Sequence, residues 1–283
     1  MAGIRDIRRH IQSVENLRHL TSAMTRVATA RGRKHRKNLD SLLPYVSGLE
    51  RVMSLLTLRH GLQHPLLQPR AIVKDVVIVI GSDRGLCGSY NTEIVRAFSR
   101  LEYPVPTLSR SVVVFGRKLA SIMEKTGQSV SRVESLPRSS SVEELAAYAE
   151  ELTDGYLRNR FQRVIILRSS DAEGGTRSVR SKILLPSSPP QTRILARLSP
   201  EIEPGSIELF DHLVPRYLLS ELRVAFLEAM IVEEETRALA MQSATTNAEE
   251  IRDELSMRYR RLRQEHITRE LLELVAGAQG IVR

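Results

Sequence analysis

The sequence predicts an α/β protein with long helices, in which one helix opens the chain, another closes it, and a compact domain lies between them. Residues 4–62 and 207–278 carry apolar side chains at mixed three- and four-residue spacing, the pattern of an amphipathic helix. The sequence between them has short apolar runs, turns and short helical patterns that alternate as in an α/β domain. Two such helices can pair into a rod, and a rod usually contacts other proteins.

The N-terminal helix is predicted from its first apolar residues, which follow the a/d spacing of a coiled coil at residues 4–17. Gly32 weakens this helix by ~1 kcal/mol relative to alanine. Pro44 marks a possible bend, because proline lacks the backbone N–H that a helix interior needs. The sequence GLQHPLLQP at residues 61–69 ends the helix.

The central domain is predicted from apolar, mostly β-branched runs at residues 76–80, 112–115 and 164–167, which are typical of strands buried on both faces of a parallel sheet. Residues 179–185 alternate in polarity and indicate an edge strand. A helical pattern covers residues 117–125. Ser141 and Glu144 resemble a capping box that opens a helix to about residue 157.

The C-terminal helix is the longest predicted element, at roughly 100 Å for ~70 residues. Its apolar stripe contains many small residues, which lets helix backbones approach closely. The stripe changes phase between blocks, so we expect an irregular supercoil. Linkers are expected at residues 186–191 and 199–206, where proline and serine are frequent.

Composition favours a basic protein without a disulfide framework. The 283 residues carry a formal net charge of +9, which favours an acidic partner such as nucleic acid, anionic lipid or an acidic protein surface. Cys87 is the only cysteine, which fits a reducing compartment, and we interpret it as a small buried hydrophobic residue. The first residues lack the apolar core of a secretory signal, and no apolar run is long enough to span a membrane.

The glycine-containing loop at residues 81–88 follows a strand and precedes a helix, where nucleotide-binding folds hold phosphate. Its sequence, GSDRGLCG, matches neither G-x-G-x-x-G nor the P-loop motif. We therefore interpret it as a tight turn whose glycines serve packing. A small-molecule-binding α/β domain with helical arms stays open as an alternative.

No catalytic or metal-ligand constellation is apparent, because the seven histidines are scattered along the chain. Asp171 and Glu173 are interpreted as turn residues, and residues 233–235 as an acidic run on a solvated helix face. The basic run at residues 31–37 is interpreted as a solvated or partner-facing helix. Because this run and the net charge are basic, a coiled-coil nucleic-acid-binding protein is the alternative function.

Three separated segments resemble the gamma subunit family of F-type ATP synthases, in the order expected of that family. They are IRDIRRHIQSVENLRHLTSAMTRVATARGRK near the start, DRGLCGSYN in the first strand-to-helix turn, and AMQSATTNAEEIRDEL followed by RLRQEHITRELLELVAGAQGI near the end. The resemblance implies an antiparallel, left-handed coiled coil of the terminal helices plus a central Rossmann-like α/β domain. The expected segments are an N-terminal coiled-coil helix at 1–70, a central α/β foot domain at 71–200 and a C-terminal coiled-coil helix at 201–283.

The resemblance also implies a function for this fold as a central rotor shaft. The shaft would couple ion flow through a membrane ring of c subunits to ATP synthesis or hydrolysis at the beta subunits. The implied partners are the alpha and beta subunits of a hexamer, the epsilon subunit and the c ring, without nucleic acid. The subunit would hold no cofactor or metal, would not be catalytic itself, and would lie peripherally on the cytoplasmic face of a bacterial inner membrane.

The resemblance implies contact residues position by position. The beta-subunit contacts would be Arg26, Arg237, Arg263, Gln264, Thr268 and Glu270, and the foot and c-ring contacts would be Glu203 and Pro204. Arg26 and Arg260 depart from the family pattern by adding positive charge to the shaft. Such departures indicate a divergent branch of the family, compatible with an alternate ATPase operon.

Overall fold

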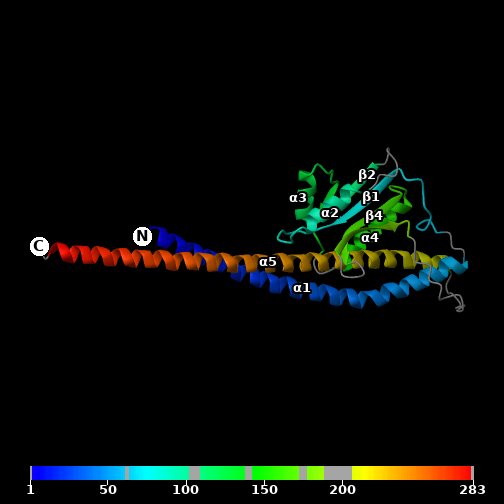
Figure 1. The fold of residues 1–283 in the computed structure, drawn as a ribbon. Helices are drawn as coiled ribbons and strands as arrows, with labels where there is room; N and C mark the ends of the chain where they lie inside the picture. Colours follow the sequence, from blue (N-terminus) through cyan, green and yellow to red (C-terminus); the bar gives the residue numbers. More distant parts are fainter. Residues whose placement is uncertain are drawn as a thin grey trace. The chain divides into compact units, whose positions relative to one another are not determined.

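The computed structural model describes residues 2–60, 64–101, 109–137, 142–171, 177–187 and 206–281, and it has the predicted α/β fold with long terminal helices (Figure 1). The elements in chain order are α1 (Ala2–His60), β1 (Lys74–Ile80), α2 (Tyr90–Ser99), β2 (Ser109–Phe115), α3 (Arg117–Lys125), β3 (Arg132–Glu134), α4 (Val142–Leu157), β4 (Arg163–Asp171), β5 (Arg177–Leu185) and α5 (Ser206–Ile281).

The chain divides into two compact units. Unit 1 comprises Met1–Ala28 and Arg237–Arg283, and unit 2 comprises Thr29–Thr236. Both units therefore contain a stretch of α1 and a stretch of α5.

The sheet of unit 2 has the strand order β3-β2-β1-β4-β5. The first four strands of this order are parallel, and β5 is antiparallel to β4 at one edge. The predicted strands, including the edge strand, are confirmed. Sequence reasoning missed β3, because this strand has only three residues and no apolar run.

Side chains of β1 alternate between two hydrophobic clusters, which explains why its apolar run is continuous. Val77 and Val79 pack with residues of α2 and α3, such as Ile94. Ile78 and Ile80 pack with α4 and with the stretches of α1 and α5 that belong to unit 2. A strand that is covered by helices on both faces needs apolar side chains on both.

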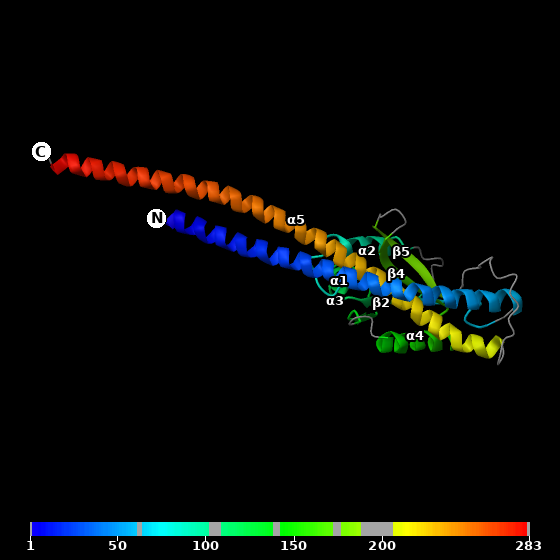
Figure 2. The ribbon, with the colours of Figure 1, turned by 90° about the horizontal axis from the view of Figure 1, so that it is seen from below.

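The two long helices run antiparallel within each unit, as the resemblance implied. In unit 2, Leu42 and Val46 of α1 form a cluster with Val224 and Leu227 of α5. In unit 1, α1 and α5 lie side by side with opposite chain directions (Figure 2). The α1 helix continues through Pro44 and ends at His60, so the possible bend does not interrupt it.

Candidate partner-binding surface of the paired helices

The seam of unit 1 is built from small and medium side chains. The residues that α1 buries there recur at intervals of seven and are Val14, Thr21 and Ala28. In the same unit, α5 buries Met241, Thr245 and Ala248, together with Arg237 at the start of its stretch. The seven-residue spacing is that of a heptad, but Leu17, which the sequence prediction placed on the stripe, is 50% exposed, and Thr21 is buried instead. The small side chains of this seam bury less apolar area than leucine or isoleucine would.

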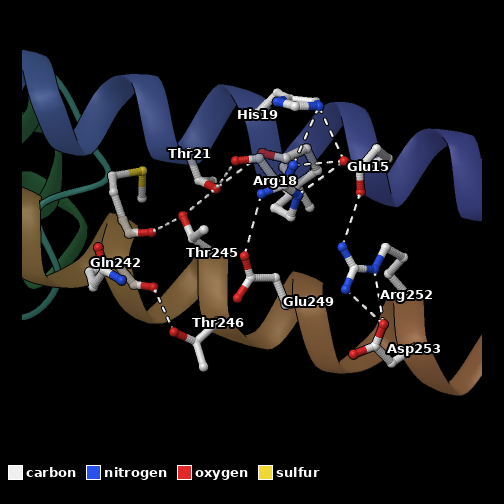
Figure 3. Close-up of polar contacts among 12 residues, drawn as sticks. Glu15, Arg18, His19, Thr21, Gln242, Thr245, Thr246, Glu249, Arg252 and Asp253 are labelled. Carbon is white, nitrogen blue, oxygen red and sulfur yellow. Dashed lines mark hydrogen bonds and ion pairs between the residues drawn. The ribbon is translucent and has the colours of Figure 1, made fainter.

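A pair of buried threonines crosses this seam (Figure 3). The Thr245 hydroxyl lies 2.7 Å from Thr21 Oγ1 and 2.8 Å from the Met241 carbonyl oxygen. The Thr21 hydroxyl also lies 3.1 Å from the Leu17 carbonyl oxygen. Each hydroxyl has one proton, so at most two of these three hydrogen bonds form at the same time, and the bond between the helices competes with the bonds to the carbonyls of each helix.

Ion pairs flank the threonine pair on one side, as Figure 3 shows. Arg18 Nη2 donates to Glu15 Oε1 at 2.7 Å, and Arg18 Nη1 reaches Glu249 of α5 at 3.4 Å. Arg252 of α5 reaches Glu15 Oε2 at 3.8 Å. The hydrogen bond from Arg18 lowers the pKa of Glu15, and the same bond raises the pKa of Arg18.

These contacts show an antiparallel register in unit 1, because Glu15, Arg18 and Thr21 face Arg252, Glu249 and Thr245 in reverse order. Extended along both helices, this register brings Ala2 beside Gln264. The α5 helix continues from there to Ile281, beyond the first described residue of α1 (Figure 2).

The part of α5 near and beyond this point carries four of the six expected beta-subunit contacts. Arg263, Gln264, Thr268 and Glu270 are all exposed. The Thr268 hydroxyl donates to the Gln264 carbonyl of its own helix at 2.9 Å, and Glu270 lies 3.3 Å from His266. The side chains of Arg263 and Gln264 project from neighbouring positions of one helix.

Two other expected contact residues differ in exposure. Arg26 is exposed on α1, whereas Arg237 is buried within the chain at 5% exposure. Glu203 and Pro204 lie outside the described residues. Burial of Arg237 inside this chain leaves little of its side chain for a separate subunit to contact.

Exposed apolar side chains accompany these polar residues and were missed by sequence reasoning. Ile267, Leu271 and Leu272 are 45%, 57% and 65% exposed, and Met257 is 64% exposed. Ile267 and Leu271 belong to the apolar stripe that was interpreted as a seam with the other helix, whereas Met257 and Leu272 lie off it. Large exposed apolar side chains in a row mark a surface that another protein covers.

The acidic run of α5 is not a solvated face, and that interpretation was wrong. Glu233 and Glu234 are each only 6% exposed, because this stretch of α5 packs inside unit 2. Arg31 Nη1 lies 3.8 Å from Glu234 Oε1, so the basic run of α1 faces the acidic run of α5. Sequence alone could not show this, since the two runs are about 200 residues apart.

Arg36 and Asp171 form a second contact of the basic run. Arg36 donates to Asp171 Oδ2 at 2.9 Å and to Glu235 Oε1 at 2.8 Å. The hydrogen bonds to these two carboxylates raise the pKa of Arg36. Asp171 is the last residue of β4 rather than part of a turn, and Glu173 lies outside the described residues.

The glycine-containing loop after β1 is a tight packed turn, as predicted. A Cβ at Gly81 would lie 2.4 Å from Leu119, so only glycine fits there. Asn91 donates to Ser82 Oγ at 2.7 Å and accepts from the Ser82 backbone at 3.2 Å, which holds the loop. Cys87 is buried beside these two side chains, as a small residue of this core.

A pocket of about 340 Å³ lies beside this loop in unit 2. It is lined by Arg31, His35, Asp83, Arg84, Leu136, Pro137, Met230, Glu233 and Glu234. Both Asp83 oxygens accept backbone hydrogen bonds, from Arg117 and Leu136 at 3.1 Å each. Burial lowers the pKa of His35. The lining sets three carboxylates against Arg31 and Arg84, so it does not concentrate positive charge as a phosphate site would.

Within the described ranges, no group of three or more histidine, cysteine or acidic residues is arranged to hold a metal ion. None of the helices in the same ranges has a stretch long and apolar enough to cross a lipid bilayer.

Comparison with known proteins identifies the family of this chain. The family model described as "ATP synthase" matches residues 3–281. The ATP synthase gamma chain of Geobacter metallireducens is 32% identical over 292 residues, and that of Roseiflexus castenholzii is 33% identical over 290, each covering 99% of both chains. The chain belongs to the ATP synthase gamma chain family.

Solved structures share the fold of this gamma chain. A chain of the Euglena gracilis mitochondrial ATP synthase, in the structure of OSCP, F1 and c-ring in rotational state 3, has a TM-score of 0.68 at 17% identity. The match covers 99% of this chain and 95% of that one. A chain in the central stalk and c-ring structure of the Tetrahymena thermophila mitochondrial ATP synthase has a TM-score of 0.58 at 20% identity, over 80% of this chain and 99% of that one.

The family assignment answers the nucleic-acid alternative left by the sequence. A nucleic-acid-binding coiled coil is not supported, because the relatives over the full chain are ATP synthase gamma chains. The basic run that motivated this alternative contacts acidic residues of the same gamma chain.

Proposed function

We propose that this gamma chain is the central rotor shaft of an F-type ATP synthase. In that role it couples ion flow through a membrane c ring to ATP synthesis or hydrolysis at the beta subunits. The chain itself contributes no catalytic group, and the nucleotide chemistry takes place on the beta subunits. Family membership supports this role, and the exposed surface of α5 in unit 1 is the observation that carries it to particular residues.

The exposed apolar side chains of α5 in unit 1 are proposed to be covered by surrounding subunits. Burying apolar surface gains roughly 25 cal/mol per Å², so Ile267, Leu271 and Leu272 are more stable inside a surrounding subunit than in water. An apolar surface allows a helix to rotate inside surrounding subunits, because the hydrophobic effect is non-directional. The alpha and beta subunits are the proposed surrounding subunits.

A band of arginines next to this apolar stretch supplies charge. Its exposed members are Arg258, Arg260, Arg261 and Arg263. Guanidinium groups form bidentate hydrogen bonds with carboxylates, so the band fits acidic loops of the surrounding beta subunits. Arg263 and Gln264 are proposed to contact such loops, with Thr268 and Glu270 beyond them and Arg26 on α1. For Arg237, burial restricts any such contact to a small part of the side chain.

We propose that the membrane-facing contacts are made by residues outside this surface. Glu203 and Pro204 are assigned to the foot that rests on the c ring, with the epsilon subunit beside it. The chain would then lie peripherally on the cytoplasmic face of a bacterial inner membrane. The segments 1–70, 71–200 and 201–283 would serve as first shaft helix, foot domain and second shaft helix.

The test uses the double variant Arg263→Ala with Gln264→Ala, reconstituted with alpha and beta subunits. A hydrogen bond to a charged group contributes ~1.5–3 kcal/mol. Its loss is expected to lower complex yield by roughly tenfold or more, since 1.4 kcal/mol is a factor of ten, and to lower steady-state ATPase. The matched control is Arg9→Ala with Gln12→Ala, an exposed Arg/Gln pair on α1. Wild-type yield and turnover in the α5 variant would remove these two residues from the coupling contact.

A further inference from the structure

His64 lies in the turn that follows α1, and its imidazole ring is buried against the start of α5. The residue is 7% exposed. Its ring centroid lies 4.9 Å from that of Phe210, and its Nε2 atom lies 2.8 Å from Asp211 Oδ1. Its Nδ1 atom lies 3.2 Å from the backbone nitrogen of Leu66. All of these residues belong to unit 2, so the contacts form within one compact unit.

These contacts require one protonation state of the ring. A backbone N–H can only donate, so Nδ1 of His64 must be the unprotonated nitrogen that accepts from Leu66. The proton of the neutral ring then lies on Nε2, which donates to Asp211. In the charged ring both nitrogens are donors. Nδ1–H would then face the Leu66 N–H, and the hydrogen bond within the turn would be lost.

The two polar partners of the ring respond differently when the ring becomes charged. The Asp211 carboxylate favours a charged ring beside it, so the contact with α5 is kept. The Leu66 N–H belongs to a residue that is only 2% exposed, and it is left without an acceptor. Histidine changes its charge between about pH 5 and 8. Mild acid therefore removes the contact with the turn and leaves the contact with α5.

Asp211 is the charged side chain that the ring contacts, among the residues that the structure describes. Phe210 and Leu66, which also contact the ring, carry no charge. The other titratable side chains near this point of α5 are exposed, and they are Glu208, His212 and Arg216. Salt screens interactions between exposed charges, so the direct contacts dominate the response of the ring.

The turn after α1 contacts the chain on both sides of residues 188–205. The Leu66 carbonyl oxygen accepts from the backbone N–H of Ser187, just after β5, at 2.8 Å. The His64 ring contacts α5 at Asp211, a few residues after that helix begins. Residues 188–205 include the two proposed c-ring contacts. One turn therefore holds the chain before and after the part that is proposed to meet the membrane ring.

We propose that His64 is a pH switch in this turn. The neutral ring holds Leu66, and the charged ring releases Leu66 while it stays paired with Asp211. Release of Leu66 loosens the hold of the turn on Ser187, and so on one end of residues 188–205. The switch itself rests on the contacts of unit 2 alone. Its consequence for the complex deepens, and rests on, the proposed function as a rotor shaft.

Three variants separate the switch from other effects of acid. An asparagine side-chain oxygen accepts from the backbone N–H two residues on, so His64→Asn keeps an acceptor for Leu66 and cannot become charged. Asp211→Asn removes the partner of the charged ring, so release of Leu66 should need a more acidic solution. His212→Gln removes an exposed histidine next to Asp211 and is the matched control.

The ring is followed by nitrogen NMR of the full chain with labelled histidine, in which the signals absent from His64→Asn belong to His64. We expect a neutral ring with its proton on Nε2 at about pH 8 and a charged ring at about pH 5. A ring with its proton on Nδ1 at the higher pH would overturn the proposal. So would a ring that stays neutral at the lower pH.

The turn is followed by deuterium exchange of the Leu66 amide, expressed as protection relative to an unstructured peptide at the same pH. We expect this protection to fall by roughly tenfold from the neutral to the charged ring, the effect of losing one hydrogen bond. His212→Gln should match wild type, and His64→Asn should keep its protection. Unchanged protection in wild type, or an equal fall in His64→Asn, would overturn the proposal.

The consequence for the complex is tested in vesicles that hold the reconstituted ATP synthase. We expect His64→Asn to match wild type in ions pumped per ATP hydrolysed at about pH 8, and to exceed it at about pH 6. Equal ratios at both pH values would overturn the consequence and leave the switch standing. If the wild-type chain gave no coupled activity at either pH, the proposed function would fail, and the NMR and exchange data would still decide the switch.

Discussion

Gly32 lies in the interior of α1, where glycine costs helix stability because its backbone is the most flexible in the unfolded chain. A Cβ added there would lie 3.7 Å from Glu234 Cβ, an ordinary contact distance. We therefore expect Gly32→Ala to raise the free energy of unfolding by ~0.5–1 kcal/mol. Denaturant titration of the full chain, followed by circular dichroism, measures this change.

Gly81 provides the contrasting control, since a Cβ there would overlap Leu119 at 2.4 Å. Gly81→Ala should lower the free energy of unfolding by ~1–3 kcal/mol, the usual cost of overpacking. If both alanine variants shifted stability in the same direction, local space would not explain the roles of these glycines.

Glu50 of α1 predicts a pH dependence of stability. Burial raises its pKa, and the nearby carboxylate of Glu221 raises it further. Because the folded pKa exceeds the unfolded one, the contribution of Glu50 to stability is complete below the unfolded value and is lost as pH rises through the folded pKa. Above pH 4.5, wild-type stability should therefore fall relative to that of Glu50→Gln. Unfolding titrations at a series of pH values measure the difference.

The pKa of Glu15 is shifted in the opposite direction from that of Glu50, so Glu15 serves as a comparison. Its pKa is lowered, first by the hydrogen bond from Arg18, so its contribution is present above the unfolded value and lost as pH falls through the folded pKa. Glu15→Gln should therefore change the acid limb of the stability profile, below pH 4.5. Parallel profiles for the two glutamine variants would contradict both assignments.

At the scale of elements, local patterns predicted most of the sheet and helices. The β-branched run of β1 is apolar throughout because helices cover both faces of that strand. The three-residue β3 has no such pattern and depends on pairing with β2. Burial of Glu233 and Glu234 depends on partners far away in the sequence, so an acidic run looked like a solvated face.

The candidate contact surface was predicted only in part. Its polar residues, such as Arg263 and Gln264, came from the family resemblance and not from any pattern of charge or spacing. The exposed apolar residues Ile267 and Leu271 have the same helical spacing as seam residues. Only the register of α1 against α5 shows that they lie beyond the paired stretch, and register is a tertiary property.

The end of α5 should be the least stable helical segment of the free chain. The seam of unit 1 before it is built from small residues such as Ala28 and Ala248, and the last turns of α5 extend past Ala2. Helices with little tertiary packing open readily. We expect backbone amides of residues 258–281 to exchange with deuterium within seconds in the free chain and to be protected in the assembled complex. Equal protection from deuterium exchange in the free chain and in the complex would show that this helical segment is stable without surrounding subunits.

At the scale of the whole molecule, the purified chain is expected to hydrolyse no ATP. Its sequence has no P-loop, the loop that holds the phosphates in one large class of ATP-hydrolysing proteins. A phosphate-release assay on the chain, with and without alpha and beta subunits, measures this. Turnover that co-elutes with the chain after those subunits are removed would contradict the expectation.

The antiparallel contact of Thr21 with Thr245 also sets the order of events during synthesis. The ribosome makes the first residues of α1 more than 200 positions before their partners in α5. Contacts between such distant residues form late and slow folding, because a long loop must close first. The sheet of unit 2 can fold while synthesis continues, but the early part of α1 must wait with its apolar stripe uncovered. Chaperone capture of nascent chains should therefore concentrate on this segment until α5 emerges.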